Sequence, residues 1–323
     1  MKEAFAAWLT AEVGQPVTIG WIERASYGFS RENWLFDATW AGQTHALIAR
    51  RDPPGSVLRT DRRIETAVLD ALERSAVPVP TLRWVDLTGR WAARPCLVMD
   101  RVQGTCQPLV LNSDRSLAQR VAVAERIYDQ LAAIHGLDWR ALGLGDRLEI
   151  PSGDAPGRAL EHWTTELRAV QREPEPELAL VRRWLGDHLP RSTTTTLVHG
   201  DFKPGNVLLD ADDRVTAVLD WETAHLGDPH EDLGWVTNPL RAGEHRIAGS
   251  WEPADLVHRW ATTTGIAVDH DALRWWQILA NYKLAVIVLT GVGAFHDGLL
   301  ERIHQQPVGI YRLLMTQLIA AEK

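Results

Sequence analysis

Residues 197–209 read Leu197-Val198-His199-Gly200-Asp201-Phe202-Lys203-Pro204-Gly205-Asn206-Val207-Leu208-Leu209. Apolar residues enter this stretch and leave it, so the pattern predicts two short strands with a polar loop between them. The loop carries a carboxylate at Asp201 and an amide five positions later, at Asn206. A His-Gly-Asp sequence by itself is typical of an ordinary turn, so its meaning depends on the residues that follow.

A second carboxylate follows at the end of another apolar run, where residues 215–219 lead directly into Asp220. The spacing of Asp201 and Asn206 matches kinase catalytic loops, in which the Asp takes the proton of the acceptor hydroxyl and the Asn binds Mg²⁺. A lone Asp after a strand is usually a turn or helix-cap residue. Both motifs in this order favour phosphoryl transfer, with Asn206 and Asp220 supplying oxygen ligands to a hard cation.

The chain around these motifs divides into two parts that differ in their predicted secondary structure. Residues 17–98 show the alternation and turn signals of short strands. The elements predicted there are strands at 17–24, 33–39, 44–50, 82–86 and 95–98, with one amphipathic helix at 60–74. The pattern after residue 104 is mostly helical and begins with an amphipathic helix at 116–137. We therefore predict an α+β fold with a small β-rich lobe at residues 1–103, a hinge at about 99–104, and a larger, mainly helical lobe at residues 104–323.

Composition and charge exclude several other classes. With 45% hydrophobic and 24% charged residues, the chain has a globular composition. A net charge of −8 without a basic cluster argues against a nucleic-acid partner. The longest apolar run, at 284–295, is interrupted by one Thr and two Gly and is shorter than a membrane span. With two cysteines and no signal-like start, we expect a cytoplasmic protein without a membrane partner.

The site motifs resemble those of the aminoglycoside phosphotransferase and choline kinase superfamily, on His199-Gly200-Asp201, Asn206 and Asp220. The longer run at 219–233, Leu-Asp-Trp-Glu-Thr-Ala-His-Leu-Gly-Asp-Pro-His-Glu-Asp-Leu, is similar to the branch found beside, or fused to, acyl-CoA dehydrogenases. The resemblance covers nearly the whole chain and implies a protein-kinase-like two-lobe fold. It also implies an ATP-dependent phosphotransferase that uses Mg²⁺ and acts on a hydroxyl of a small molecule, with GTP open as the alternative nucleotide.

The resemblance assigns a role to each site residue. It makes Asp201 the catalytic base and makes Asn206 and Asp220 the metal ligands. The residues that it implies at the nucleotide are Gly28 and Ser30 over the phosphates, Arg50 on the phosphates with Glu65 as its partner, the Asp100 carbonyl and Val102 amide at the adenine edge, and Leu219 under the adenine ring.

Two neighbouring arginines compete for the phosphate-binding role. Arg50 stands where most members of the superfamily have a lysine, and Arg51 follows it directly. Alternation along a strand lets only one of them face the cleft, and we favour Arg50. Its guanidinium keeps the positive charge of lysine and adds a planar fork that can bind phosphate oxygens in pairs.

Five further residues receive structural interpretations. His199 is expected to be a packing residue that fixes its loop, and His135 a helix-end residue. Asp232 is expected to hydrogen-bond backbone groups as the cap of a helix. The pair Trp275-Trp276 is expected to pack in the core, because it falls at helical spacing among apolar residues.

The acceptor has two interpretations. The branch resemblance implies a hydroxyacyl-type or other non-sugar alcohol. The helical lobe, with 30 acidic and 21 basic residues, would instead suit a cationic acceptor such as an aminoglycoside or another antibiotic. A rival from another class is a pseudokinase scaffold that binds nucleotide without catalysis. Such a protein would have lost Asp201, Asn206 or Asp220, and all three are present.

Overall fold

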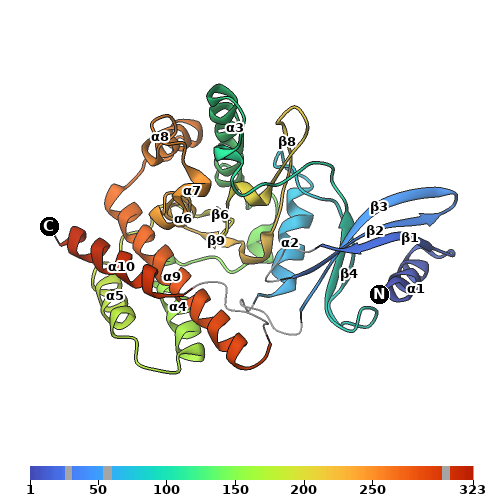
Figure 1. Cartoon of the computed structure of the whole chain (residues 1–323), viewed down its shortest axis with the longest axis horizontal. Coiled ribbons are helices and arrows are strands. Elements are labelled where there is room, and N and C mark those ends of the chain that lie inside the picture. The colour runs from blue at the N-terminus through green and yellow to red at the C-terminus, as the bar shows by residue number, and fades with distance from the viewer. Residues whose placement is uncertain (26–30, 54–59, 300–305, 323) are drawn as a thin grey trace.

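The computed structural model describes residues 1–25, 31–53, 60–299 and 306–322, which form two lobes of different construction (Figure 1). Strands dominate the N-terminal lobe and helices dominate the C-terminal lobe. The predicted α+β two-lobe architecture is therefore confirmed. The segments with Gly28 and Ser30 lie outside the described residues, so the expectations for these two positions receive no structural account.

An antiparallel sheet with strand order β1-β2-β3-β5-β4 forms the N-terminal lobe. Each of the five strands predicted there is present within two residues of its expected bounds. The strands are β1 (Thr18–Arg24), β2 (Glu32–Trp40), β3 (Gln43–Arg51), β4 (Leu82–Asp86) and β5 (Cys96–Asp100).

Two helices accompany this sheet. Helix α2 (Arg62–Leu72) lies within the predicted range and is capped by Asp61, whose side chain accepts a hydrogen bond from the Arg63 backbone N–H. Helix α1 (Lys2–Val13) was not predicted. It buries Phe5 and Trp8 against the sheet, and the Phe5 ring stacks on Phe36 with centroids 5.1 Å apart. These apolar residues follow helical spacing, so the sequence does carry a signal for α1.

Helices make up most of the C-terminal lobe. They are α3 (Leu117–His135), α4 (Ala155–Val170), α5 (Pro176–Asp187), α6 (His230–Val236), α7 (Ala242–His245), α8 (Pro253–Thr264), α9 (His270–His296) and α10 (Val308–Ala321). Two short antiparallel pairs are inserted among them. The pair β7 (Val207–Leu209) and β8 (Val215–Val218) was predicted, whereas β6 (Thr196–Val198) pairs with β9 (His225–Gly227), a strand that was not predicted.

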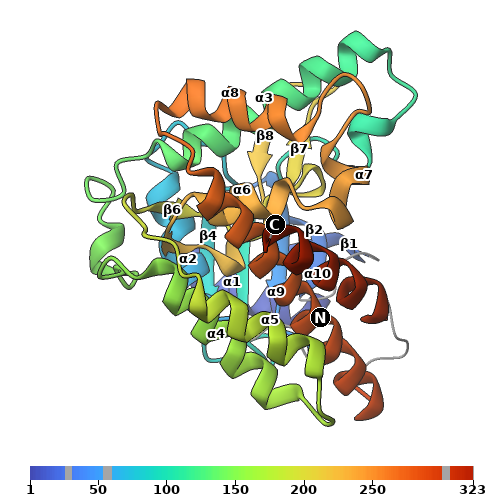
Figure 2. The same cartoon turned by 90° about the vertical axis from the view of Figure 1, so that its left-hand side faces the viewer.

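Helix α9 is the central helix of this lobe. It contacts α4, α5, α6 and α10 (Figure 2). By length and composition α9 could cross a membrane, the one such helix among the described residues. Its first half is buried inside the protein, and that half includes the polar residues Asn281 and Lys283. Burial against four other helices identifies α9 as a core helix.

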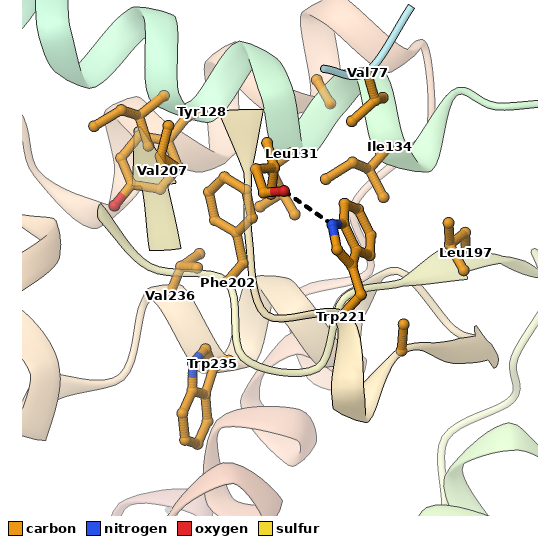
Figure 3. Packing of buried hydrophobic residues seen from close by; sticks show 14 of the residues in the cluster. Val77, Tyr128, Leu131, Ile134, Leu197, Phe202, Val207, Trp221, Trp235 and Val236 are labelled. Atoms are coloured by element: carbon orange, nitrogen blue, oxygen red, sulfur yellow. Dashed lines mark hydrogen bonds between the residues drawn. The ribbon is translucent and has the colours of Figure 1, made fainter. Parts of the chain in front are cut away.

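Buried aromatic side chains anchor the two loops that carry the site motifs (Figure 3). Phe202 and Trp221 are fully or almost fully buried in one cluster with Leu131 of α3. The indole N–H of Trp221 also donates to the Val218 carbonyl oxygen over 3.0 Å. Because Phe202 follows Asp201 and Trp221 follows Asp220, this packing fixes both carboxylate-bearing segments to the same helix.

Candidate active site

The loop between β6 and β7 makes its turn at a glycine that cannot be replaced without strain. Gly200 has φ of 81°, in the left-handed region that favours glycine. A Cβ at this position would lie 2.8 Å from the Thr223 carbonyl oxygen. The Thr223 hydroxyl in turn donates to the His199 carbonyl oxygen over 3.0 Å. The loop that carries Asp201 and the segment after Asp220 are therefore held in direct contact.

A buried carboxylate orders the backbone of this loop. Asp232 accepts the N–H of His199 over 2.7 Å and the N–H of Gly200 over 2.9 Å. Asp232 is the third residue of α6, and its partners belong to the loop that carries Asp201. The expectation that Asp232 bonds backbone groups is right, but its assignment as a helix cap is wrong.

His135 extends this network, and its description as a helix-end residue is incomplete. It is buried, with its Nε2 3.1 Å from Asp232 and its Nδ1 2.9 Å from the Trp260 indole N–H. Since the indole can only donate, Nδ1 accepts and the imidazole proton lies on Nε2, toward Asp232. Although burial opposes ionisation, the hydrogen bonds from His135 and from the His199 backbone N–H lower the pKa of Asp232 to about 2.

His199 lies inside the loop in the manner expected of a packing residue. It is fully buried between the rings of Phe202 and Trp221, and its Nε2 lies 3.0 Å from the Leu219 carbonyl oxygen. Burial lowers the pKa of His199, against the opposing charges of Asp232 and Asp201. A neutral, buried imidazole thus links the Asp201 loop to the strand end that precedes Asp220.

Asp201 lies at the partly exposed end of the loop, and two loop residues contact it. The Asn206 amide nitrogen donates to the Asp201 carbonyl oxygen over 2.9 Å. The Lys203 ammonium lies 2.5 Å from the Asp201 carboxylate. Although burial opposes the charge of Lys203, Asp201 raises its pKa. Sequence reasoning missed Lys203; its place in the same loop, two residues after Asp201, was the available signal.

Asn206 and Asp220 lie next to each other because the backbones of their segments are joined. The Leu219 N–H donates to the Asn206 carbonyl oxygen over 2.8 Å. Asp220 has φ of 70°, a left-handed conformation that aspartate tolerates better than most residues. With its amide nitrogen on Asp201, Asn206 keeps its side-chain oxygen for another ligand. One carboxylate and one amide oxygen fit Mg²⁺, a hard cation that completes its shell with phosphates and water.

Arg50 reaches this pair from the other lobe. Its guanidinium lies 2.5 Å from Glu65 of α2 and 2.5 Å from Asp220. Against the effect of burial, these carboxylates raise the pKa of Arg50. Arg51 points to the opposite face of the sheet, where it contacts Glu32 over 2.8 Å. The structure therefore brings Arg50, and not Arg51, together with Glu65 and Asp220.

Further ion pairs surround Arg50, and no sequence pattern predicted them. Arg62 donates to Glu65 over 2.9 Å and to the Arg50 carbonyl oxygen over 3.0 Å. Arg31 lies 3.0 Å from Glu222, which is buried two residues after Asp220. Arg62 thus ties α2 to the end of β3, and the Arg31–Glu222 pair joins the residue before β2 to the segment that carries Asp220.

The predicted hinge residues lie at the junction of the lobes. Asp100 ends β5; its N–H donates to the Thr81 carbonyl oxygen over 3.0 Å, and its carboxylate pairs with Arg83. Val102, itself half-buried, follows in a connector that is exposed from Gln103 onward. Thr105 then pairs with Leu209 through two backbone hydrogen bonds of 2.9 and 3.0 Å. The connector is thus attached to the β7–β8 hairpin that ends beside Leu219.

Comparison with known proteins gives a family and two groups of relatives. Residues 21–276 match the profile described as phosphotransferase enzyme family (APH). Acyl-CoA dehydrogenase family member 11 of Rattus norvegicus is 34% identical over 287 residues, which cover 82% of this chain and 37% of that protein. The chain spans well under half the length of the acyl-CoA dehydrogenase relatives that it matches.

Solved structures share the fold. A protein of Ralstonia eutropha provisionally assigned as an aminoglycoside phosphotransferase gives a TM-score of 0.75 at 24% identity, covering 99% of this chain and 97% of that one. The complex of APH(2″)-IIa with streptomycin and ATP gives a TM-score of 0.59 at 15% identity, covering 90% of each chain. These similarities confirm the predicted protein-kinase-like fold.

Proposed function

Because the chain belongs to the phosphotransferase enzyme family, we propose that it transfers the γ-phosphoryl group of ATP to a hydroxyl of a small molecule. The family confirms the predicted superfamily and the enzyme class. The proposal adds the nucleotide, the metal and the residue roles. A protein of the same fold was solved with ATP, and GTP is the competing nucleotide in the tests below because other proteins of this fold were solved with GDP.

One observation carries the proposal. Asp201, Asn206 and Asp220 lie on two loops that hydrogen bonds join at Leu219–Asn206 and Thr223–His199, with Arg50 contacting Asp220 from the other lobe. A base, two oxygen ligands and a cation thus converge at the junction of the lobes. Phosphoryl transfer needs this set, because its catalysis is mainly positioning and neutralisation of charge.

Asp201 is the proposed base. Its carboxylate would accept a hydrogen bond from the acceptor hydroxyl and take its proton as the new O–P bond forms. Lys203, whose ammonium lies 2.5 Å from that carboxylate, adds positive charge beside the acceptor. The hydrogen bonds from Asn206 and the anchoring of Phe202 hold Asp201 in place.

Asn206 and Asp220 are the proposed Mg²⁺ ligands, and Arg50 the proposed phosphate-binding residue. Mg²⁺ would supply neutralisation of the phosphate charge. Arg50 is fixed by Glu65 on one side, so its remaining N–H groups face the Asp220 side, where the phosphates would lie. We further propose that Asp100 and Val102 bind the adenine edge, that Leu219 packs under the ring, and that Gly28 and Ser30 cover the phosphates.

The acceptor is proposed from the similarity to acyl-CoA dehydrogenase family members, which favours a hydroxyacyl-type or other non-sugar alcohol. An aminoglycoside is the competing acceptor, because a protein of the same fold was solved with streptomycin. Both cysteines are unpaired, as expected in the reducing cytoplasm where we place the enzyme.

A screen for ADP release tests this proposal. The protein is incubated with ATP or GTP, with Mg²⁺ or EDTA, and with hydroxy acids, hydroxyacyl thioesters, amino alcohols, aminoglycosides or macrolides. We expect Mg²⁺-dependent release that one acceptor class stimulates. Nucleotide binding without release for any acceptor would instead support a pseudokinase scaffold.

A further inference from the structure

A buried lysine contacts the backbone directly beside the proposed base. Lys283 of α9 is 6% exposed, and its ammonium donates to the Gly200 carbonyl oxygen over 2.6 Å. Its Nζ also lies 4.6 Å from the Trp235 ring centroid and 5.3 Å from that of Trp163. Because Gly200 precedes Asp201, the ammonium places a positive charge against the peptide group that leads into the base.

The position of this charge is unfavourable for folding on its own. An ammonium loses its hydration when it is buried, and a carboxylate in close contact is the usual compensation. Glu231 lines the same small cavity as Lys283, but its carboxylate lies 3.1 Å from His225. An apolar side chain or a neutral donor would fill the position of Lys283 at a lower cost. Packing alone therefore does not account for a lysine here.

Lys283 and His199 hold the two ends of one peptide group. The carbonyl of Gly200 and the N–H of Asp201 belong to the same peptide plane. Lys283 donates to its oxygen, and its N–H donates to His199 Nδ1 over 3.3 Å. Asp232 binds only the preceding N–H groups, those of His199 and Gly200. Since glycine allows many backbone orientations, the contact with Lys283 fixes the plane to which the Asp201 side chain is attached.

His199 carries this arrangement on to the second loop. A backbone N–H can only donate, so His199 Nδ1 accepts from Asp201, and the proton of the neutral ring lies on Nε2. Nε2 then donates to the Leu219 carbonyl oxygen over 3.0 Å, in the peptide group that leads into Asp220. All three hydrogen bonds point in the same direction, away from Lys283. Hydrogen bonds in such a chain polarise and strengthen one another, so a positive charge at its first donor strengthens the whole chain.

We propose that Lys283 is a positioning residue for phosphoryl transfer, which orients Asp201 through the Gly200 carbonyl and links it through His199 to the Asp220 peptide. This inference rests on the proposed function and adds a role for the central helix of the C-terminal lobe. The requirement is for the charge and the donor of Lys283, and not for its bulk. The effect falls on the chemical step, because the contact orients the base.

Single-turnover transfer and ATP titration of three variants test this inference. Lys283→Met keeps the length of the side chain and removes the charge and the donor. It should slow the chemical step about 10- to 100-fold, the effect of a small misplacement of a reacting group, with ATP affinity close to that of the wild type. Lys283→Arg should be faster than Lys283→Met. Lys2→Met, the same change at an exposed lysine, should transfer at the wild-type rate. Wild-type transfer by Lys283→Met, or an equal loss in Lys283→Arg, would overturn the proposal.

A variant at the next link keeps the test decisive if Lys283→Met does not fold. His199→Phe retains a ring between Phe202 and Trp221 and removes both nitrogens of the link. It should slow the chemical step while ATP affinity stays close to that of the wild type. Where Lys283→Met folds, adding it to His199→Phe should cause little further loss. Unchanged transfer by His199→Phe, or fully additive losses in the double variant, would refute the chain.

Amide hydrogen exchange distinguishes this inference from the proposed function, because it needs no acceptor. In Lys283→Met, the amides at residues 199–206 should exchange several-fold faster than in the wild type, while those of the N-terminal sheet stay unchanged. If this occurs but the wild type transfers phosphate to no acceptor, the role of Lys283 in ordering the loop holds and the phosphotransferase assignment fails. If exchange and transfer are both unchanged in Lys283→Met, the phosphotransferase assignment holds and the role of Lys283 is refuted.

Discussion

Replacing Arg50 by alanine should weaken ATP binding and destabilise the junction of the lobes. The Arg50 side chain is 12% exposed and bridges Glu65, which is fully buried, and Asp220, which is 24% exposed. Removing one partner of a buried pair costs about 3–5 kcal/mol. Glu65 still forms its ion pair with Arg62 over 2.9 Å in the variant. We therefore expect Arg50→Ala to lower the free energy of unfolding by about 3 kcal/mol, the lower end of that range. Loss of the phosphate contact should reduce ATP affinity about 10- to 100-fold.

The matched control is Arg51→Ala. Arg51 contacts Glu32 on the opposite face of the sheet, so its removal should affect stability while ATP affinity stays within about twofold of the wild type. Calorimetry with Mg²⁺ measures the affinity, and urea unfolding measures the stability. Arg50→Lys tests whether a point charge suffices, since an ammonium cannot engage two carboxylates in the manner of a planar fork. If Arg51→Ala weakened ATP binding and Arg50→Ala did not, the assignment of Arg50 would be refuted.

Three other perturbations test the metal site and the loop. EDTA should weaken ATP binding strongly in calorimetry, because two protein oxygens cannot replace the missing cation; equal affinity would contradict the metal assignment. Gly200→Ala should lower kcat and destabilise the fold by about 1–3 kcal/mol in urea unfolding, because its backbone is left-handed and its Cβ would meet Thr223. Asp232 has a folded pKa of about 2, against about 3.9 for an unfolded aspartate. Its contribution to the free energy of unfolding should therefore be complete above about pH 4 and lost as the pH falls toward 2; Asp232→Asn should abolish this part of the acid-unfolding profile, and an unchanged profile would count against the network.

Local signals account for the parts of the fold that the sequence predicted. The strands of the N-terminal lobe alternate and are separated by turn residues, and α2 has an apolar stripe that ends before Val77-Pro78. Alternation also separated Arg50 from Arg51, because adjacent residues of a strand point to opposite faces. The loop from Asp201 to Asn206 forms a compact turn in the structure, because the strands on either side of it, β6 and β7, are each paired with another short strand.

Contacts between distant segments account for what was missed. The bond from His135 to Asp232 joins residues 97 positions apart, and the bond from Lys283 to the Gly200 carbonyl joins residues 83 positions apart. Neither has a local pattern, because a buried polar residue in a helix resembles an exposed one in sequence. Strand β9 was missed for a related reason: His225-Leu226-Gly227 is not an apolar run of the kind that marks β6 and β7.

The measurement that tests the central claim most directly is single-turnover phosphoryl transfer from radiolabelled ATP to an acceptor found in the screen, for the wild type and Asp201→Asn. Asparagine is nearly isosteric with aspartate but cannot take the hydroxyl proton. We predict a loss of about 10²- to 10⁴-fold in the chemical step, with ATP affinity and stability close to those of the wild type. Wild-type transfer by Asp201→Asn would contradict the assignment of Asp201 as the base.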